Sequence, residues 1–230
     1  MSRRDDLNRF YEILNDLQEH IGGYRCLRDC TAKSGWPERG LYFFFEDGEL
    51  REDQKSLRVV RVGTHAITGT SKTTLWNRLH THRGHSDGRG NHRGSIFRKR
   101  VGEALLSSKE YAEDIRSSWK IRRVTDIGRN AEAPLEREVS AHIGRMRLVW
   151  LAVNDAPSTK SDRGYLERNS IALLSNVNKP PIDAPSPHWL GFHSGQKTIA
   201  DSGLWNTNHV ADQYEASFLD RFHSRMRTAS

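Results

Sequence analysis

Two short apolar runs separated by a turn signal constrain the fold of this chain more than any other feature. Residues 41–45 and 57–62 are rich in aromatic and β-branched side chains, which favour extended backbone. Asp47-Gly48 lies between the runs and is a strong turn-forming pair. The segment is therefore predicted to be a β-hairpin that carries Gly40-Leu41-Tyr42 on its first strand and Arg61-Val62-Gly63 on its second.

The chain next enters a segment with helical periodicity. Leu75 and Leu79 recur at helical spacing within residues 72–82, and serine and threonine residues ahead of them supply a start signal. Arg78 and His82 are four residues apart, so both stand on one face of the predicted helix, beside the apolar stripe. A basic pair in this position has the outline of a phosphate clamp.

Positive charge is concentrated in the same region. Residues 61–100 hold nine Lys or Arg residues against the single acid Asp87. Like charges at this density repel one another, and a bound polyanion relieves that cost while releasing its own counterions. A solvated basic face without a ligand is the alternative, but glycines interleaved over residues 82–94 allow close approach of a ligand and favour nucleic acid. The candidate nucleic-acid contacts are Lys72, Arg83, Arg89, His92, Arg93 and Arg98.

In order and spacing, these residues resemble the GIY-YIG endonuclease superfamily. Gly40-Leu41-Tyr42 and Arg61-Val62-Gly63 stand where that family has its two tripeptides, and the pair Arg78 and His82 follows on a helix. The resemblance covers residues 38–180 and implies a mixed α/β (α+β) fold with a small central three-stranded sheet flanked by helices. Apolar patterns allow the remaining elements, which are a helix over 95–106, a third strand over 146–153 and a last helix over 162–174.

The resemblance also implies a metal site. In the family the last helix presents a metal-binding glutamate, and the match falls on Glu167. Glu136 and Glu138 are competitors, but they precede the third strand. One divalent cation is expected, Mg²⁺ or alternatively Mn²⁺, because Mg²⁺ prefers few protein carboxylates and keeps several waters. Asn176 or Asn178, just beyond the helix, matches a supporting polar residue of the family, and both remain candidates.

The reaction implied by the resemblance is hydrolysis of a phosphodiester. Tyr42 would take the proton of the attacking water, directly or through another group, and Arg78 would hold the scissile phosphate as its charge grows. His82 would share that phosphate or position the water, and the cation on Glu167 would stabilise the leaving 3′ oxygen. Arg61 stands where the family usually has tyrosine. Either it faces solvent on an edge strand, or its charge favours the phenolate form of Tyr42.

Three segments are expected along the chain. An N-terminal amphipathic helical segment, 1–37, packs on the core; a nuclease-like core spans 38–180 with an insertion at 107–141; and a C-terminal extension spans 181–230. Apolar residues recur at helical spacing in the first segment, and Gly22-Gly23 closes the run. Homodimerisation through this helix is the alternative to packing on the core.

The sequence thus predicts a metal-dependent endonuclease that acts on nucleic acid, DNA rather than RNA, in a restriction-like, defence or repair role. A net charge of +7 and a pI near 9.6 agree with a polyanionic partner. No apolar run approaches the ~20 residues that span a bilayer, so a cytoplasmic enzyme without a membrane partner is expected. The alternatives are a nucleic-acid-binding protein that keeps this fold without turnover, and a nuclease directed at RNA.

Overall fold

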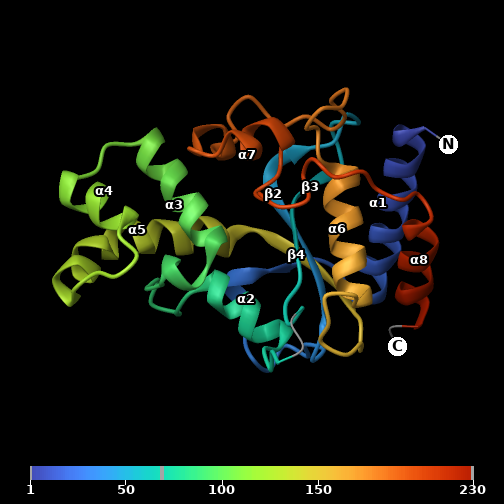
Figure 1. Ribbon diagram of the computed structural model, residues 1–230, viewed down its shortest axis with the longest axis horizontal. Helices are drawn as coiled ribbons and strands as arrows, with labels where there is room; N and C mark the ends of the chain where they lie inside the picture. The colour runs from blue at the N-terminus through green and yellow to red at the C-terminus, as the bar shows by residue number, and fades with distance from the viewer. Residues whose placement is uncertain (1, 68–69, 229–230) are drawn as a thin grey trace.

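The computed structural model describes residues 2–67 and 70–228 (Figure 1). Within them the strands form one antiparallel four-stranded sheet in the order β1-β4-β2-β3. The strands are β1 Arg25–Cys26, β2 Gly40–Leu50, β3 Leu57–Gly63 and β4 Arg147–Ala152. The helices are α1 Arg3–His20, α2 Leu75–Arg83, α3 Ile96–Ser108, α4 Glu113–Lys120, α5 Asp126–Arg145, α6 Asp162–Leu174, α7 Lys197–Ser202 and α8 Phe218–Thr228, with 3₁₀ turns at Leu27–Asp29, His92–Gly94 and Leu190–His193.

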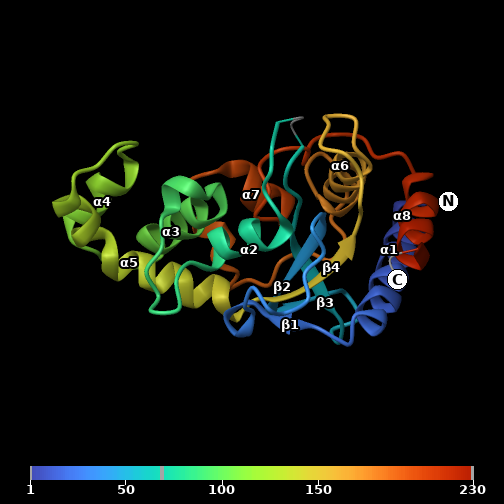
Figure 2. The same ribbon diagram turned by 90° about the horizontal axis from the view of Figure 1, so that it is seen from below.

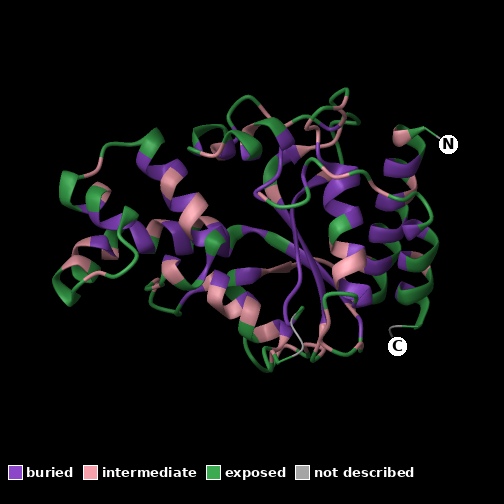
Figure 3. Cartoon of the chain, in the orientation of Figure 1, coloured by how far each residue is buried: buried purple, intermediate pink, exposed green. Residues whose placement is uncertain are grey.

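β2 lies inside the sheet, and both of its faces are covered. It pairs with β3 on one side and β4 on the other. Leu41, Phe43 and Phe45 belong to one hydrophobic cluster, whereas Tyr42 and Phe44 belong to a second cluster on the opposite face. Figure 3 shows this burial along the central strands and the inner sides of the helices. Because both faces are buried, residues 41–45 form a continuous apolar run instead of an alternating one.

The first face of the sheet is covered by helices from both ends of the chain. α1, α6 and α8 pack side by side on it (Figures 1 and 2). α1 begins with a capping box in which Ser2 and Asp5 satisfy each other's backbone N–H groups. Phe222 of α8 stacks on Phe43 of β2 with ring centroids 5.6 Å apart. The terminal segments therefore contribute directly to the core that supports the central strand.

The second face carries α2, α3 and α5, and α4 packs on α5 farther from the sheet (Figure 2). Arg98 of α3 connects these helices. Its Nε donates to Oε2 of Glu136 on α5 at 3.1 Å, and its Nη1 donates to the carbonyl oxygen of His82 on α2 at 2.9 Å. Arg98 has no exposed surface, so a single buried guanidinium on α3 satisfies polar groups from two other helices.

The mixed α+β fold is confirmed, and the sheet has one strand more than predicted. The additional strand, β1, pairs Arg25 and Cys26 with the start of β4. A two-residue strand is too short to produce an alternating pattern, which explains why it was not predicted. The predicted helix over 162–174 coincides with α6, and the predicted insertion at 107–141 contains α4 and most of α5. In the described part of the chain, no helix is both long and apolar enough to cross a membrane.

Candidate active site

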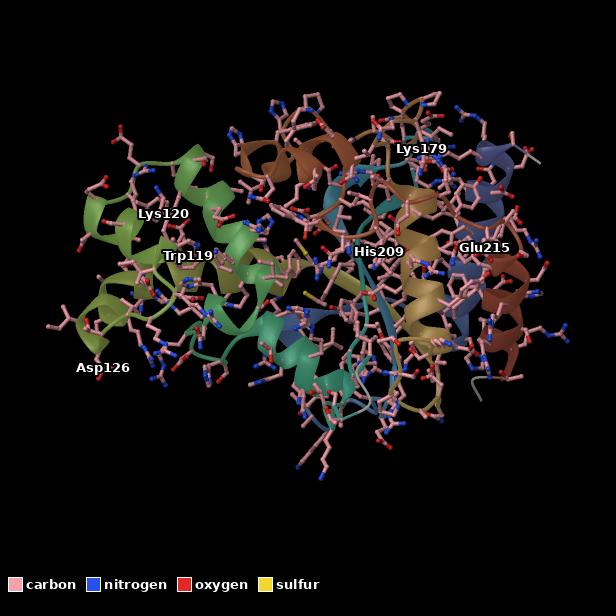
Figure 4. The ribbon with its side chains drawn as sticks, viewed as in Figure 1. Trp119, Lys120, Asp126, Lys179, His209 and Glu215 are labelled. Atoms are coloured by element: carbon pink, nitrogen blue, oxygen red, sulfur yellow. The ribbon has the colours of Figure 1, made fainter. Side chains whose placement is uncertain are left out.

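A pocket of about 340 Å³ is lined by residues that lie far apart in the sequence. Arg61 comes from β3, Arg78 from α2 and Glu167 from α6, so three residues predicted for catalysis meet at one place. Residues 206–209 form another wall, and Figure 4 shows His209 beside α6. The end of β3 and the helices on both sides of the sheet thus bring two cations and one carboxylate together.

Glu167 is the acidic side chain of this pocket. Its Oε1 accepts a hydrogen bond from the backbone N–H of Thr64 at 3.0 Å. Burial raises the pKa of the Glu167 carboxyl above its usual range, although the nearby Arg61 guanidinium acts in the opposite direction. A bound cation would stabilise the ionised form that burial disfavours. The chemistry of this oxygen donor therefore suits a hard divalent cation.

A cation at Glu167 would depend largely on waters and substrate for its other ligands. Among the described residues, no group of three or more His, Cys, Asp or Glu side chains is arranged to hold a metal ion. Mg²⁺ tolerates this arrangement because it binds through one or two carboxylates and phosphate oxygens. The competing acids are committed elsewhere, since Glu136 pairs with Arg98 and Glu138 pairs with Lys109.

Arg61 is buried and does not face solvent. It is 6 % exposed, its Nη1 donates to the carbonyl oxygen of Trp205 at 3.0 Å, and its guanidinium carbon lies 4.5 Å from the Phe97 ring centroid. Burial lowers its pKa, but an arginine stays protonated under all physiological conditions. The Nε atoms of Arg61 and Arg78 are both buried without a hydrogen-bond partner in the described structure. Both side chains line the pocket, and the protein leaves their Nε–H groups without an acceptor.

Tyr42 and His82 form a hydrogen bond behind the pocket. Oη of Tyr42 lies 2.8 Å from Nε2 of His82, and neither residue has exposed surface. Nδ1 of His82 lies 2.8 Å from Oγ of Ser95, which also caps α3. Burial, together with the charges of Arg78 and Arg61, holds the pKa of His82 well below its usual range. The imidazole is therefore neutral, and it contacts Tyr42 instead of sharing a phosphate directly.

The glycines of the two tripeptides make room for this arrangement. Gly63 on β3 is paired with Tyr42 on β2. A methyl carbon at Gly63 would lie 2.7 Å from Cε2 of the Tyr42 ring and still closer to the hydroxyl. A methyl carbon at Gly40 would overlap the carbonyl oxygen of Leu151 on β4. Only hydrogen fits at these two positions, which gives a physical reason for glycine in each tripeptide.

Asn206 is a polar residue of the pocket that the sequence did not indicate. Its Oδ1 accepts from the backbone N–H of Val62 at 3.0 Å, and its Nδ2 donates to the Val62 carbonyl at 2.8 Å. Asn206 thereby makes the hydrogen bonds that a neighbouring strand would make with Val62 on the free edge of β3. It also lines the pocket. Asn176 and Asn178 are absent from the described lining, and Asn176 bonds Arg3 instead. Asn206 stands in a segment without helical or strand periodicity, so nothing nearby marked it as functional.

The residues predicted to contact nucleic acid fall into two groups, and the first is internal. Arg98 is fully buried, and His92 is 2 % exposed with its Nδ1 2.9 Å from Oε1 of Glu136. Arg93 makes two hydrogen bonds of 2.7 Å with the carboxylate of Glu132. Arg98 and His92 therefore hold helices together instead of facing a ligand. The prediction from local charge counted them as surface residues because their acidic partners lie much later in the chain.

The second group lies at the surface. Lys72 is exposed ahead of α2, and Arg89 is exposed and paired with Asp87 at 2.6 Å. Arg83 is partly exposed and donates to the carbonyl oxygen of Cys30. These three side chains remain candidates for phosphate contacts, since surface ion pairs of this kind contribute little and are readily exchanged.

Comparison with known protein families identifies one match. A family model described as the GIY-YIG domain matches residues 1–230. Comparison with curated proteins and with solved structures yields no match. The matched range includes α1 and α8 as well as the expected core over 38–180.

Proposed function

Since the chain belongs to the GIY-YIG domain family, a family of nucleases, we propose that it is a divalent-metal-dependent endonuclease that hydrolyses phosphodiester bonds in DNA. One observation carries the proposal: Arg61, Arg78 and Glu167 converge on one pocket, against the Tyr42–His82 pair. Two cations and one carboxylate suit a phosphate and a metal ion together. A restriction-like or defence role suits an enzyme of this kind, as the resemblance to the family suggests.

Glu167 is the proposed metal ligand. Mg²⁺ is the proposed ion because it combines a carboxylate with waters and phosphate oxygens. When bound, the ion would act as a Lewis acid on the departing oxygen. The carboxylate must be ionised for this purpose, and Arg61 favours that form while burial opposes it. Thr64 fixes the position of Oε1 through its backbone N–H, which orients the carboxylate before a ligand arrives.

Arg78 and Arg61 are proposed to hold the scissile phosphate. Each has a buried Nε–H without an acceptor in the described residues, so a phosphate oxygen would satisfy a donor that the protein leaves unpaired. Arg61 is fixed by Trp205 and by the face of Phe97, so its charge is already in place when negative charge grows on the phosphate. Stabilisation by fixed charges of this type is a major source of catalysis.

Tyr42, as the phenolate, is proposed to receive the proton of the attacking water, directly or through another group. His82 does not take that proton itself, because burial and three arginines disfavour its imidazolium form. In the tautomer that carries the proton on Nε2, His82 donates to the Tyr42 oxygen, and Ser95 Oγ–H donates to Nδ1. His82 thus donates to the Tyr42 oxygen, and the nearby Arg61 guanidinium interacts electrostatically with Tyr42. Ser95 is a positioning residue for this tautomer.

The test is a cleavage assay with purified protein. Single-stranded DNA, duplex DNA and RNA are incubated with Mg²⁺ or with chelator, and the wild type is compared with Glu167→Ala. Glu12→Ala, at an exposed glutamate of α1, serves as the matched control. We expect cleavage of DNA that requires both Mg²⁺ and Glu167 and that survives the control substitution.

Three results would overturn parts of the proposal. Tight binding of DNA with no cleavage under any divalent ion would establish a binding protein that keeps the fold without turnover. Cleavage of RNA in preference to both forms of DNA would retain the nuclease but replace its substrate. A Glu167→Ala variant with wild-type activity would remove Glu167 from the metal site.

A further inference from the structure

A second pocket, of about 310 Å³, lies on the helical lobe formed by α3, α4 and α5. It is bounded by the first turns of α3 and by the end of α4 with the residues that follow, where Figure 4 shows Trp119 and Lys120. Ile96, at the start of α3, lines this pocket and the active-site pocket as well. The two pockets therefore lie next to each other and share the Ile96 side chain. We call the second one the lobe groove.

Basic side chains without partners surround the lobe groove. Lys120 and Arg122 are exposed and have no ion-pair partner in the described part of the chain. Lys99 is 36 % exposed and is only 4.0 Å from Glu103, at the limit of an ion pair. Arg93, by contrast, is closed off by Glu132. Two cations without an acidic partner and a third that is only weakly paired make a groove that attracts an anion.

Exposed apolar side chains accompany these cations. Ile96 is 44 % exposed and Ile121 is 49 % exposed, and both line the lobe groove. Ile67, 43 % exposed, continues the row into the active-site pocket. Large aliphatic side chains at the surface next to lysine and arginine suit a ligand that presents phosphates beside apolar sugar and base edges. A small inorganic anion would leave the isoleucines without a partner.

The floor of the groove is rigid. The rings of His92 and Trp119 are stacked 3.6 Å apart with an interplanar angle of 19°. The Glu136 carboxylate accepts from both the backbone N–H of His92 and its Nδ1. Nε2 of His92 is buried without a hydrogen-bond partner among the described residues. A fixed floor lowers the entropic cost of binding.

We propose that the lobe groove binds the sugar–phosphate backbone of the substrate strand on one side of the bond that is cut. The inference rests on the proposed function, because the strand is the one that enters the active-site pocket and passes over Ile96. Lys120 and Arg122 contact phosphates, and Ile96 and Ile121 contact sugars or base edges. The helical lobe thereby extends the stretch of nucleic acid that the protein contacts. It does so without taking part in the chemistry at Glu167.

The test removes two groove charges and measures binding separately from cleavage. Lys120→Gln with Arg122→Gln is compared with Lys55→Gln with Arg227→Gln, a control pair at exposed positions on the hairpin loop and on α8. Affinity for a duplex that spans both pockets is measured with chelator over a range of salt concentrations. Each phosphate contact contributes about 0.9 to the slope of log affinity against log salt.

We expect the groove variant to bind about tenfold more weakly at low salt, with a salt slope reduced by about two. Its kcat at saturating DNA should remain within twofold of wild type, and the control pair should change neither quantity. An unchanged affinity and salt slope, or an equal loss of affinity in the control pair, would refute the proposal that the lobe groove binds the substrate strand. If the wild type binds DNA through the lobe groove but cleaves nothing, the proposed role of the groove in binding is supported and the proposed nuclease activity is refuted.

Discussion

A single methyl group at Gly63 is expected to disable the site while the fold remains. The added carbon would lie 2.7 Å from Cε2 of Tyr42. Cζ and Oη of the ring are closer still, and ordinary carbon contacts begin at about 3.5 Å, so the ring must move by more than about 1 Å. The Tyr42–His82 hydrogen bond, now 2.8 Å, would then exceed hydrogen-bonding range. Overpacking of this kind costs about 1–3 kcal/mol in stability, and a misplacement near 1 Å costs about 10²-fold in rate.

The assay compares kcat on duplex DNA and the free energy of unfolding in urea for wild type and Gly63→Ala. Gly195→Ala is the control, because a methyl carbon there meets nothing within 4 Å. We expect a kcat about 10²-fold lower for Gly63→Ala, with unchanged affinity for DNA. Wild-type kcat would show that the Tyr42–His82 bond does not position the reacting groups. Complete unfolding would show that the methyl group disrupts β2–β3 pairing instead of the ring.

Three further predictions concern buried polar groups. Because burial raises the pKa of Glu167, stability from this group is present in acid and lost as pH rises through that pKa. Glu167→Gln should therefore unfold at higher urea than wild type at pH 7 without metal, although its nuclease activity is lost. Ser95→Ala removes the cap of α3 and the partner of His82, so we expect about 1 kcal/mol lower stability and reduced kcat, with urea titration and cleavage kinetics as the measurements. Arg98→Met leaves the buried Glu136 carboxylate with only its His92 hydrogen bonds and should cost about 3–5 kcal/mol in the same titration.

The elements with strong periodicity could be predicted from the sequence. α6 begins and ends at the residues expected, because Leu166, Ile171 and Leu174 define its buried side and Ser161 caps its first turn. The hairpin could be predicted because β2 has a continuous apolar run, but its turn was predicted in the wrong place. Asp47 and Gly48 lie inside β2, and the chain reverses over 51–56. β1 could not, since its two residues are held by pairing with β4 and not by a local pattern.

The pocket was predicted in part. Arg61, Arg78 and Glu167 were expected in one site, and the structure brings them together. Asn206 was missed because its role depends on pairing with the edge of β3, far away in the sequence. A side chain that substitutes for a strand partner has no local signature. Its position becomes visible only when the free edge of the sheet is known.

The charges of neighbouring residues in the sequence predicted ligand contacts less well than the charges that surround each residue in the folded structure. Residues 61–100 hold one acid, yet Arg98 and Arg93 are neutralised by Glu136 and Glu132 of α5. A sequence window of that length cannot contain partners about forty positions away. Among the described residues, three arginines have a buried Nε–H without an acceptor, and they are Arg61, Arg78 and Arg100. Arg61 and Arg78 both lie at the pocket that holds Glu167. A buried donor without an acceptor costs stability, and under the proposed function a phosphate oxygen would offset that cost at Arg61 and Arg78.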